Sequence, residues 1–160
     1  MIKSVKYATC LLILVALVSC NRNKIYEEHK ELSPNVQWKK EDVRKFEVPI
    51  KDTDKKYDLS LALRYVSGYP WKKAVIKVKE ISPSGKVTEK KHELKIKDEN
   101  GDYIGEPGMD IWDSTHLVEE GKKYKESGTY TYKLQHAMPK DPFPFVMEAG
   151  VIVEINPKAK

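Results

Sequence analysis

The chain has 160 residues, a formal net charge of +5 and 33% charged residues. This modest excess of lysine falls short of the strongly basic surface that nucleic-acid-binding domains carry. Lysine pairs such as Lys39-Lys40 and Lys72-Lys73 stand among aspartates and glutamates, which favours a solvated surface over a patch for an anionic partner. The length after the N-terminal segments suffices for one hydrophobic core and not for two.

The first twenty residues have the pattern of an exported lipoprotein. Lys3 and Lys6 precede an uncharged run, Ala8 to Val18, which is shorter than the roughly 20 apolar residues that a membrane-spanning helix needs. This length and these flanks predict a cleaved signal peptide over residues 1–19. The sequence Leu-Val-Ser-Cys that ends at Cys20 resembles a bacterial lipobox. The resemblance implies cleavage before Cys20 and lipidation of its sulfur with a diacylglycerol and an N-acyl chain.

Lipidation at Cys20 decides both the location and the thiol chemistry of the mature chain. One acyl chain holds a protein only marginally, whereas several chains anchor it firmly. Cleavage also removes Cys10, so we expect no disulfide, no thiolate nucleophile and no cysteine metal site. Asn21 is not the aspartate that retains lipoproteins in the inner membrane of enteric bacteria, and the residues after it are not acidic. We therefore expect an outer-membrane anchor that faces the periplasm.

Residues 20–35 are predicted to form the lipid anchor and a polar tether. They contain few apolar residues and show no sustained period. Helix-forming residues between Tyr26 and Leu32 also allow a short helix there. Both interpretations place the folded domain after this segment, from residue 36.

The next part of the chain alternates apolar and polar residues, as half-buried β-strands do. The clearest run extends from Tyr57 to Val66, and Pro49 marks its predecessor as an edge strand or a strand end. Turn signals with proline and glycine, such as Pro83-Ser84-Gly85, separate the runs. Predicted strands cover residues 46–50, 57–66, 73–81 and 87–97.

Residues 105–128 break this alternation and are predicted to be mostly loop, with at most a short strand near Trp112. Alternation returns in residues 128–138 and, after a proline-rich loop, in residues 147–155. The sum is about seven or eight strands with turns between them, which predicts an all-β, single antiparallel β-sandwich over residues 36–156. Residues 157–160 form a polar tail.

No sequence motif for catalysis or metal binding is present. The chain lacks the Gly-x-Ser-x-Gly, His-Glu-x-x-His and phosphate-loop patterns. The segment from Asp98 to Asp102 begins like a calcium loop, but Tyr103 and Met109 stand where the pattern needs glycine and glutamate. None of the four histidines has another His or Cys at metal-binding spacing, and His92 is predicted to be a core or edge residue. We therefore expect no enzyme activity, no metal and no cofactor beyond the lipid.

The order of turns and core positions resembles the gliding-motility lipoprotein GldH family. The resemblance covers nearly the whole mature chain, and it rests on short segments that are individually weak but ordered and spaced alike: Trp38, Phe46-x-Val48, Leu59–Arg64, Tyr69-Pro70, Ser82-Pro83-x-Gly85-Lys86, Asp98-x-x-Gly101-x-Tyr103-Ile104-Gly105, Gly108-x-Asp110-Ile111, Gly128-Thr129-Tyr130-Thr131, Gln135-x-Ala137-Met138 and Gly150. Tyr103 stands where the family usually has tryptophan. Pro139 stands where the family often has arginine, so any role that a basic residue has at this position in the family is in doubt for this chain.

The resemblance implies a non-catalytic envelope lipoprotein associated with the gliding motility apparatus, which is linked to type IX secretion. Its partners would be the membrane, through the lipid, and other envelope or motility proteins. An alternative is a carbohydrate-binding sandwich in which exposed Tyr69, Trp71 and Trp112 stack on sugar rings. Exposed aromatic residues are also enriched in protein interfaces, so the sequence leaves both readings open, as it does ordinary packing of these rings.

Overall fold

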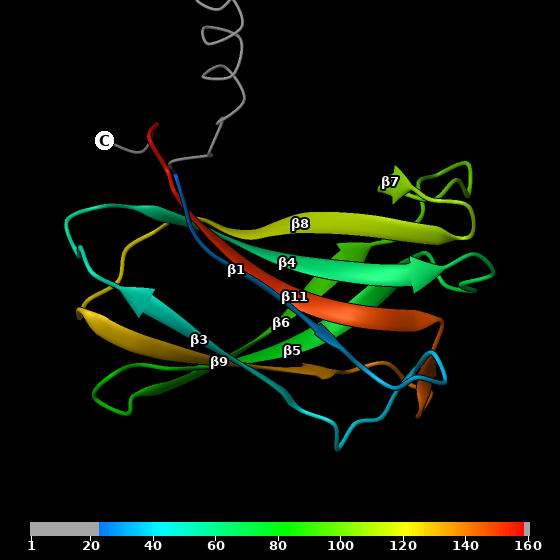
Figure 1. Ribbon diagram of the computed structural model, residues 1–160, viewed down its shortest axis with the longest axis horizontal. Coiled ribbons are helices and arrows are strands. Elements are labelled where there is room, and N and C mark those ends of the chain that lie inside the picture. The colour runs from blue at the N-terminus through cyan, green and yellow to red at the C-terminus, as the bar shows by residue number, and fades with distance from the viewer. Residues whose placement is uncertain (1–22, 159–160) are drawn as a thin grey trace, which may run out of the picture.

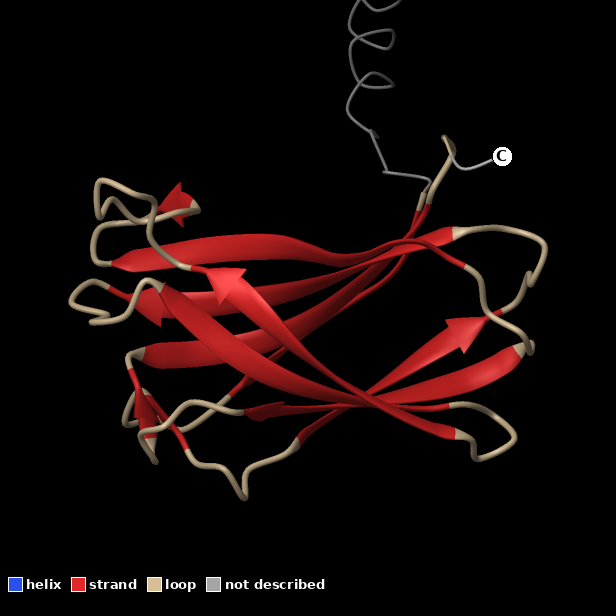
Figure 2. Ribbon diagram, turned by 180° about the vertical axis from the view of Figure 1, so that it is seen from behind, coloured by secondary structure: helices blue, strands red, loops and turns tan. Residues whose placement is uncertain are grey.

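The computed structural model describes residues 23–158, which form two antiparallel β-sheets that face each other (Figures 1 and 2). Eight of the strands in this part of the chain have seven residues or more, and three have two. The all-β sandwich predicted from the sequence is confirmed. Within residues 23–158 no helix could span a membrane.

The first sheet has five strands in the order β1-β11-β4-β8-β7. Its central strand, β4, is the clearest alternating segment of the sequence, and every second residue of it from Tyr57 to Tyr65 is buried. The bounds are β1 Lys24–Glu31, β11 Val146–Ile155, β4 Tyr57–Val66, β8 Ile111–Lys122 and β7 Glu106–Pro107. Four register shifts interrupt the pairing: one between β1 and β11, one between β11 and β4, and two between β4 and β8.

The second sheet has four strands in the order β3-β9-β5-β6. Pro49 lies on β3, an edge strand, as its missing N–H requires. The bounds are β3 Arg44–Ile50, β9 Gly128–His136, β5 Lys73–Ile81 and β6 Val87–Lys95. A third, two-stranded sheet pairs β2, Gln37–Trp38, with β10, Phe143–Pro144.

One hydrophobic core fills the space between the two large sheets. β4 contributes every second residue from Tyr57 to Tyr65, and β3, β5, β9 and β11 contribute their own inward-facing sets. Several tyrosines are fully enclosed and place their hydroxyls on internal partners, because a buried hydroxyl without a hydrogen bond is costly. Tyr124 and Tyr132 share one such bond, with their oxygens 2.7 Å apart.

An ion cluster lies where β5 and β8 approach each other across the sandwich. Lys122 Nζ on β8 lies 2.8 Å from Glu80 Oε2 on β5 and 2.6 Å from Glu119 Oε2. Burial opposes the Lys122 charge, but hydrogen bonds to Glu119 and Glu80 outweigh it and raise the pKa of the ammonium group. The cluster therefore joins the two sheets at the side away from β1.

Two predictions about individual segments were wrong. Residues 24–31 are neither tether nor helix: they form β1, which pairs with β11 along its whole length. Only residues 21–23 therefore separate Cys20 from the folded domain, instead of the tether to residue 35. Residues 111–122, predicted to be mostly loop, form the long strand β8, which pairs with β4.

Both described ends of the chain lie at one end of the sandwich (Figure 1). The Ile155 N–H donates to the Asn23 carbonyl over 2.7 Å, and the Asn156 N–H donates to the Lys56 carbonyl over 2.9 Å. We call this the tether end. It comprises the chain ends 23–24 and 156–158 and the connections 51–56, 82–86 and 123–127. The remaining connections lie at the opposite, far end.

Candidate functional site

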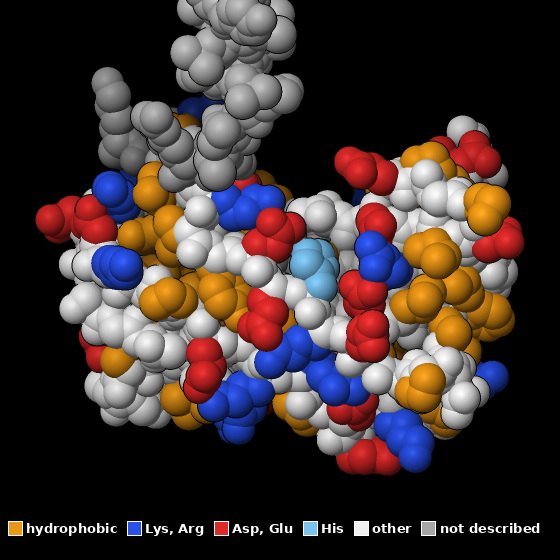
Figure 3. Space-filling view, viewed as in Figure 1, with side chains coloured by type: hydrophobic (Ala, Val, Ile, Leu, Met, Phe, Trp, Pro, Cys, Tyr) orange, Lys and Arg blue, Asp and Glu red, His pale blue; other side chains and the backbone are white. Residues whose placement is uncertain are grey.

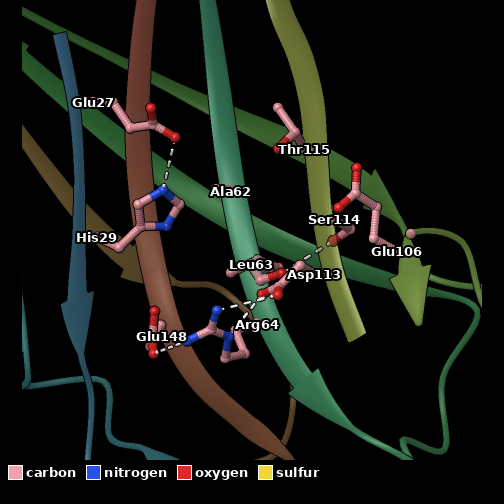
Figure 4. Close-up of a pocket in the computed structure, with 11 residues that line it drawn as sticks. Glu27, His29, Ala62, Leu63, Arg64, Glu106, Asp113, Ser114, Thr115 and Glu148 are labelled. Carbon is pink, nitrogen blue, oxygen red and sulfur yellow. Dashed lines mark hydrogen bonds and ion pairs between the residues drawn. The ribbon is translucent and has the colours of Figure 1, made fainter. Parts of the chain in front are cut away.

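A hollow of about 660 Å³ lies on the outer face of the five-stranded sheet (Figure 4). Its lining comes from β1, β4, β7, β8 and β11, so five segments of the chain meet there. Ala62 on β4 forms part of the floor, and the strand beside it carries Gly150. Because alanine carries only a methyl group and glycine has no side chain, the sheet surface is depressed between its two edges.

Gly150 also controls how closely β1 lies against β11. It is the register partner of His29 on β1. A Cβ atom placed on Gly150 would lie 2.8 Å from His29 Nδ1 and 3.0 Å from the Glu28 carbonyl oxygen. Such distances are too short for real contacts, so a side chain at residue 150 would push the His29 ring or β1 itself outward.

Arg64 is held between two carboxylates at one end of the hollow. Its Nε and Nη2 atoms donate to Asp113 on β8 over 2.7 and 3.1 Å, and its Nη1 atom donates to Glu148 on β11 over 2.5 Å. Hydrogen bonds to Asp113 come first among the causes that raise the pKa of the guanidinium group, and Glu148 adds to them. Figure 4 shows the three side chains in one row across the sheet.

The hollow carries more acidic than basic groups. Four carboxylates line it, from Glu27, Glu106, Asp113 and Glu148, against the single guanidinium group of Arg64. A hydrogen bond from Lys24 lowers the pKa of Glu27 and keeps that carboxylate ionised. The charge balance therefore suits a cationic group, such as a lysine or arginine of another protein, better than an anion.

The surface beyond the hollow is mixed in character. Figure 3 shows side chains of both charges over the middle of the face that carries β1, and hydrophobic side chains both toward the end where β7 lies and toward the opposite end. Met109, fully exposed, and Ile111, 36% exposed, belong to the part around β7. Both are at the far end, opposite the chain ends.

Of the three aromatic residues predicted to be exposed for binding, Tyr69 is not exposed. It is completely buried, and its hydroxyl donates to the Lys73 carbonyl over 2.9 Å. Its ring packs edge-on against Trp71 and Phe143, with centroids 5.6 and 5.7 Å away. Tyr69, three residues after the end of β4, therefore belongs to the core, and the loop around it turns its aromatic side chain inward.

Trp71 and Trp112 are half-buried and do not contact each other; the rings of Tyr69, Tyr65 and Tyr103 lie between them in one series of ring contacts. Trp71 packs on Phe143, whereas Trp112 packs on Tyr103, with centroids 5.8 and 5.1 Å apart respectively. Trp112 also donates from Nε1 to Ser67 Oγ over 3.2 Å. The structure thus does not assemble the predicted three-ring platform from Tyr69, Trp71 and Trp112.

The histidines are dispersed over the sandwich. His92 is half-buried on the edge strand β6, and burial lowers its pKa. In residues 23–158, no group of three or more His, Cys, Asp and Glu side chains is placed to hold a metal ion. The predicted lipidation residue, Cys20, and the signal peptide lie outside the described residues.

The chain was compared with known families over this same region. Residues 24–153 match the family described as GldH lipoprotein, so the match begins with β1 and ends within β11. The chain belongs to the GldH lipoprotein family. The family resemblance drawn from the sequence is confirmed, and the match includes both strands that the sequence analysis missed.

Two curated relatives belong to the same GldH group. A "gliding motility lipoprotein GldH homolog" of Christiangramia forsetii is 27% identical over 128 residues, which cover 80% of this chain and 77% of the relative. The "gliding motility lipoprotein GldH" of Flavobacterium johnsoniae is 29% identical over 128 residues, which cover 80% of this chain and 78% of the relative. The similarity therefore extends over most of each protein.

Among solved structures, the chain was matched to BtGH115A, described as a 4-O-methyl-α-glucuronidase. The identity is 14% and the TM-score is 0.38. The match covers 88% of this chain and 19% of that protein. At this similarity it carries no information about activity.

The site residues Arg64, Asp113 and Glu148 were missed by the sequence analysis. They lie on three strands that are distant in sequence, so no local spacing links them. The only signal was the phase of β4, which places Arg64 on the polar face of a strongly alternating strand. The partners on that face depend on strand order, which one sequence does not reveal.

Proposed function

We propose that this protein is an envelope lipoprotein that acts as a non-catalytic, accessory part of the gliding motility machinery, linked to type IX secretion. The observation that carries this proposal is the match to the GldH lipoprotein family over residues 24–153. The names of the two curated relatives support the motility role. The lipobox-like sequence before residue 21 supports anchoring through Cys20, in the outer membrane and facing the periplasm.

The arrangement of the hollow supports a role in protein contacts. Arg64 is already neutralised by Asp113 and Glu148, so it is poorly suited to bind and polarise a substrate anion. The additional carboxylates of Glu27 and Glu106 leave the hollow acidic. A basic segment of a neighbouring envelope protein fits this charge, and electrostatic complementarity of this kind steers association and fixes register.

The anchor is tested by exchanging the two cysteines separately. We expect Cys20→Ser to abolish labelling with radioactive palmitate and to release the protein from the membrane fraction. Cys10→Ser is the matched control, because that residue leaves with the signal peptide, and it should be labelled and fractionate like the unchanged protein. Equal palmitate labelling and fractionation of both variants would contradict the proposal.

The motility role is tested by deletion and complementation in the host. We expect the deletion strain to lose colony spreading and to secrete less through the type IX system, and the unchanged gene to restore both. A gene encoding His29→Gln, which removes an imidazole from the hollow, should also restore spreading if the protein is not an enzyme. Normal spreading and secretion in the deletion strain would refute the role.

A further inference from the structure

The two ends of the sandwich carry opposite net charge. The tether end holds eight lysines against three carboxylates: Lys24, Lys51, Lys55, Lys56, Lys86, Lys123, Lys125 and Lys158 against Asp52, Asp54 and Glu126. The connections at the far end, residues 32–36, 39–43, 67–72, 96–110 and 137–142, hold five lysines against eight carboxylates. The net charge is therefore +5 at one end and −3 at the other.

Hydrogen bonds and strand pairing place the tether-end segments together. The Ser84 N–H, in the connection 82–86, donates to Glu126 in the connection 123–127 over 3.0 Å. The strand ends Ile155 and Lys122 both pair with Tyr57, which follows the connection 51–56. The lysines of these segments thus share one end of the molecule, although they are scattered along the sequence.

The same end holds a small apolar surface. Ile25, Pro49 and Ile155 line a hollow of about 350 Å³ together with Lys51 and Lys55. Aliphatic side chains beside lysines are the combination found where proteins rest on a membrane interface, since the alkyl stems of lysine also contact apolar groups.

Chain length brings this end close to the lipid. Lys24, the first residue of β1, is four residues after Cys20, and four extended residues span at most about 14 Å. Strands of ten residues, such as β4, extend the sandwich by about 33 Å. The tether end of the domain therefore begins within about 14 Å of the attachment point, whereas the far end lies a further strand length of about 33 Å away.

We propose that the tether end of this domain docks on anionic phospholipid headgroups, so that the lysines of its three connections fix the domain upright with its acidic far end directed away from the membrane. This rests on the proposed lipidation of Cys20. Basic residues beside a membrane anchor are attracted to anionic lipid, and the attraction decays within a Debye length. The acidic end is repelled by the same surface.

The test measures how near each end lies to the headgroups in the full lipidated protein. The mature chain would have no free thiol, so single cysteines can be labelled cleanly at Thr53→Cys in the tether end or Met109→Cys in the far end. The labelled proteins are placed in phosphatidylethanolamine vesicles with or without phosphatidylglycerol and a headgroup quencher. In vesicles that contain phosphatidylglycerol, we expect several-fold stronger quenching at residue 53 than at residue 109. In vesicles without phosphatidylglycerol, we expect no such difference.

A charge reversal supplies the matched comparison. Lys51→Glu, Lys55→Glu, Lys86→Glu and Lys123→Glu together should remove most of the quenching at residue 53. The same number of reversals at the far end, at Lys39, Lys40, Lys72 and Lys97, should leave it unchanged. Far-ultraviolet circular dichroism checks that both variants are folded.

The outcomes separate this proposal from the one on which it rests. If the protein carries palmitate but residues 53 and 109 are quenched equally, the docking proposal is wrong and the lipid anchor stands. The same conclusion follows if quenching at residue 53 is equal with and without phosphatidylglycerol. If both charge variants lose the quenching at residue 53, the lysines of the tether end are not specifically responsible for docking. Absence of palmitate overturns the anchor and the docking together.

Discussion

At the scale of single residues, substitutions of Tyr69 test whether its ring stabilises the core or is available for binding. Its ring is enclosed by Trp71 and Phe143, and its hydroxyl is bonded to the Lys73 carbonyl. We expect Tyr69→Phe to lower the free energy of unfolding by about 1 kcal/mol and Tyr69→Ala to lower it by about 3–5 kcal/mol. Urea unfolding followed by circular dichroism measures both. A fully stable Tyr69→Ala protein would mean that the ring is not part of the core.

His136 makes stability depend on pH. Its side chain is fully buried between the rings of Trp38 and Phe143, and burial lowers its pKa from 6.5, although Asp141 lies 3.4 Å from Nε2 and opposes the shift. In the unfolded chain the imidazole regains its ordinary pKa. Below about pH 6.5 the unfolded state therefore binds a proton that the folded state rejects, and the free energy of unfolding falls as pH falls.

Unfolding in urea at several pH values tests this sign. We expect stability to be retained above about pH 6.5 and to decline below it, by up to about 1.4 kcal/mol per pH unit from one histidine. His92 and His116, whose pKa values burial also lowers, act in the same direction. His136→Phe should make the decline shallower. If the free energy of unfolding of this variant falls with pH as steeply as that of the unchanged protein, other groups control the pH dependence of stability.

At the scale of elements, the ion cluster between β5 and β8 sets how firmly the sheets are joined. Lys122→Met keeps the packing of the stem but leaves the half-enclosed carboxylate of Glu80 without its cation and that of Glu119 with only the exposed Lys90. We expect a loss of about 3 kcal/mol in the free energy of unfolding. The loss should shrink at acidic pH, because protonated carboxyl groups no longer need the cation.

Lys90→Met is the matched control for this prediction. Lys90 lies 2.7 Å from the same Glu119, but its side chain is 53% exposed. An exposed ion pair contributes at most about 1 kcal/mol, so this variant should be close to the unchanged protein. Equal losses in the two variants would show that the buried position of Lys122 has no special importance.

The strands that the sequence predicted well are those whose alternation matches their burial. In β4 and β9, apolar residues face the core and polar residues face outward, so the period of two is visible without a partner. The same holds for β3 and for most of β5, whereas β11 is buried on both faces from Ala149 to Val153. These strands supply the enclosed core, which is why the fold class could be predicted from the sequence.

The strands that were missed have inverted or weak patterns. In β8, Ser114 and His116 face inward, whereas Leu117 faces solvent and is 54% exposed. In β1, Lys30 packs its ammonium group over the Phe46 ring at 5.2 Å, so a charged residue takes an inward position. Such strands depend on main-chain pairing with β4 and β11, which local sequence does not encode. The hollow, built partly from these strands, was missed for the same reason.

At the scale of the whole molecule, two constraints act on its orientation. Under the proposed lipidation of Cys20, the covalent tether would limit the distance of Lys24 from the membrane, and the opposite charges of the two ends would favour one direction. The tether alone leaves the domain free to tilt, because it is attached at a single point. Charge is needed to select the upright arrangement, and its range, about 10 Å at 0.1 M salt, is comparable with the tether length.

Lengthening the tether should separate these constraints. With about twelve Gly and Ser residues inserted after Arg22, the linker spans about 20 Å on average, so only charge holds the tether end on the membrane. Quenching of a label at residue 53 should then be lost in about 1 M salt, where the Debye length is about 3 Å. With the native tether we expect part of the quenching to persist in the same salt, because the chain keeps that end near the headgroups. Salt-resistant quenching in the lengthened protein would mean that apolar contacts around Ile25 and Pro49, not lysines, hold this end in place.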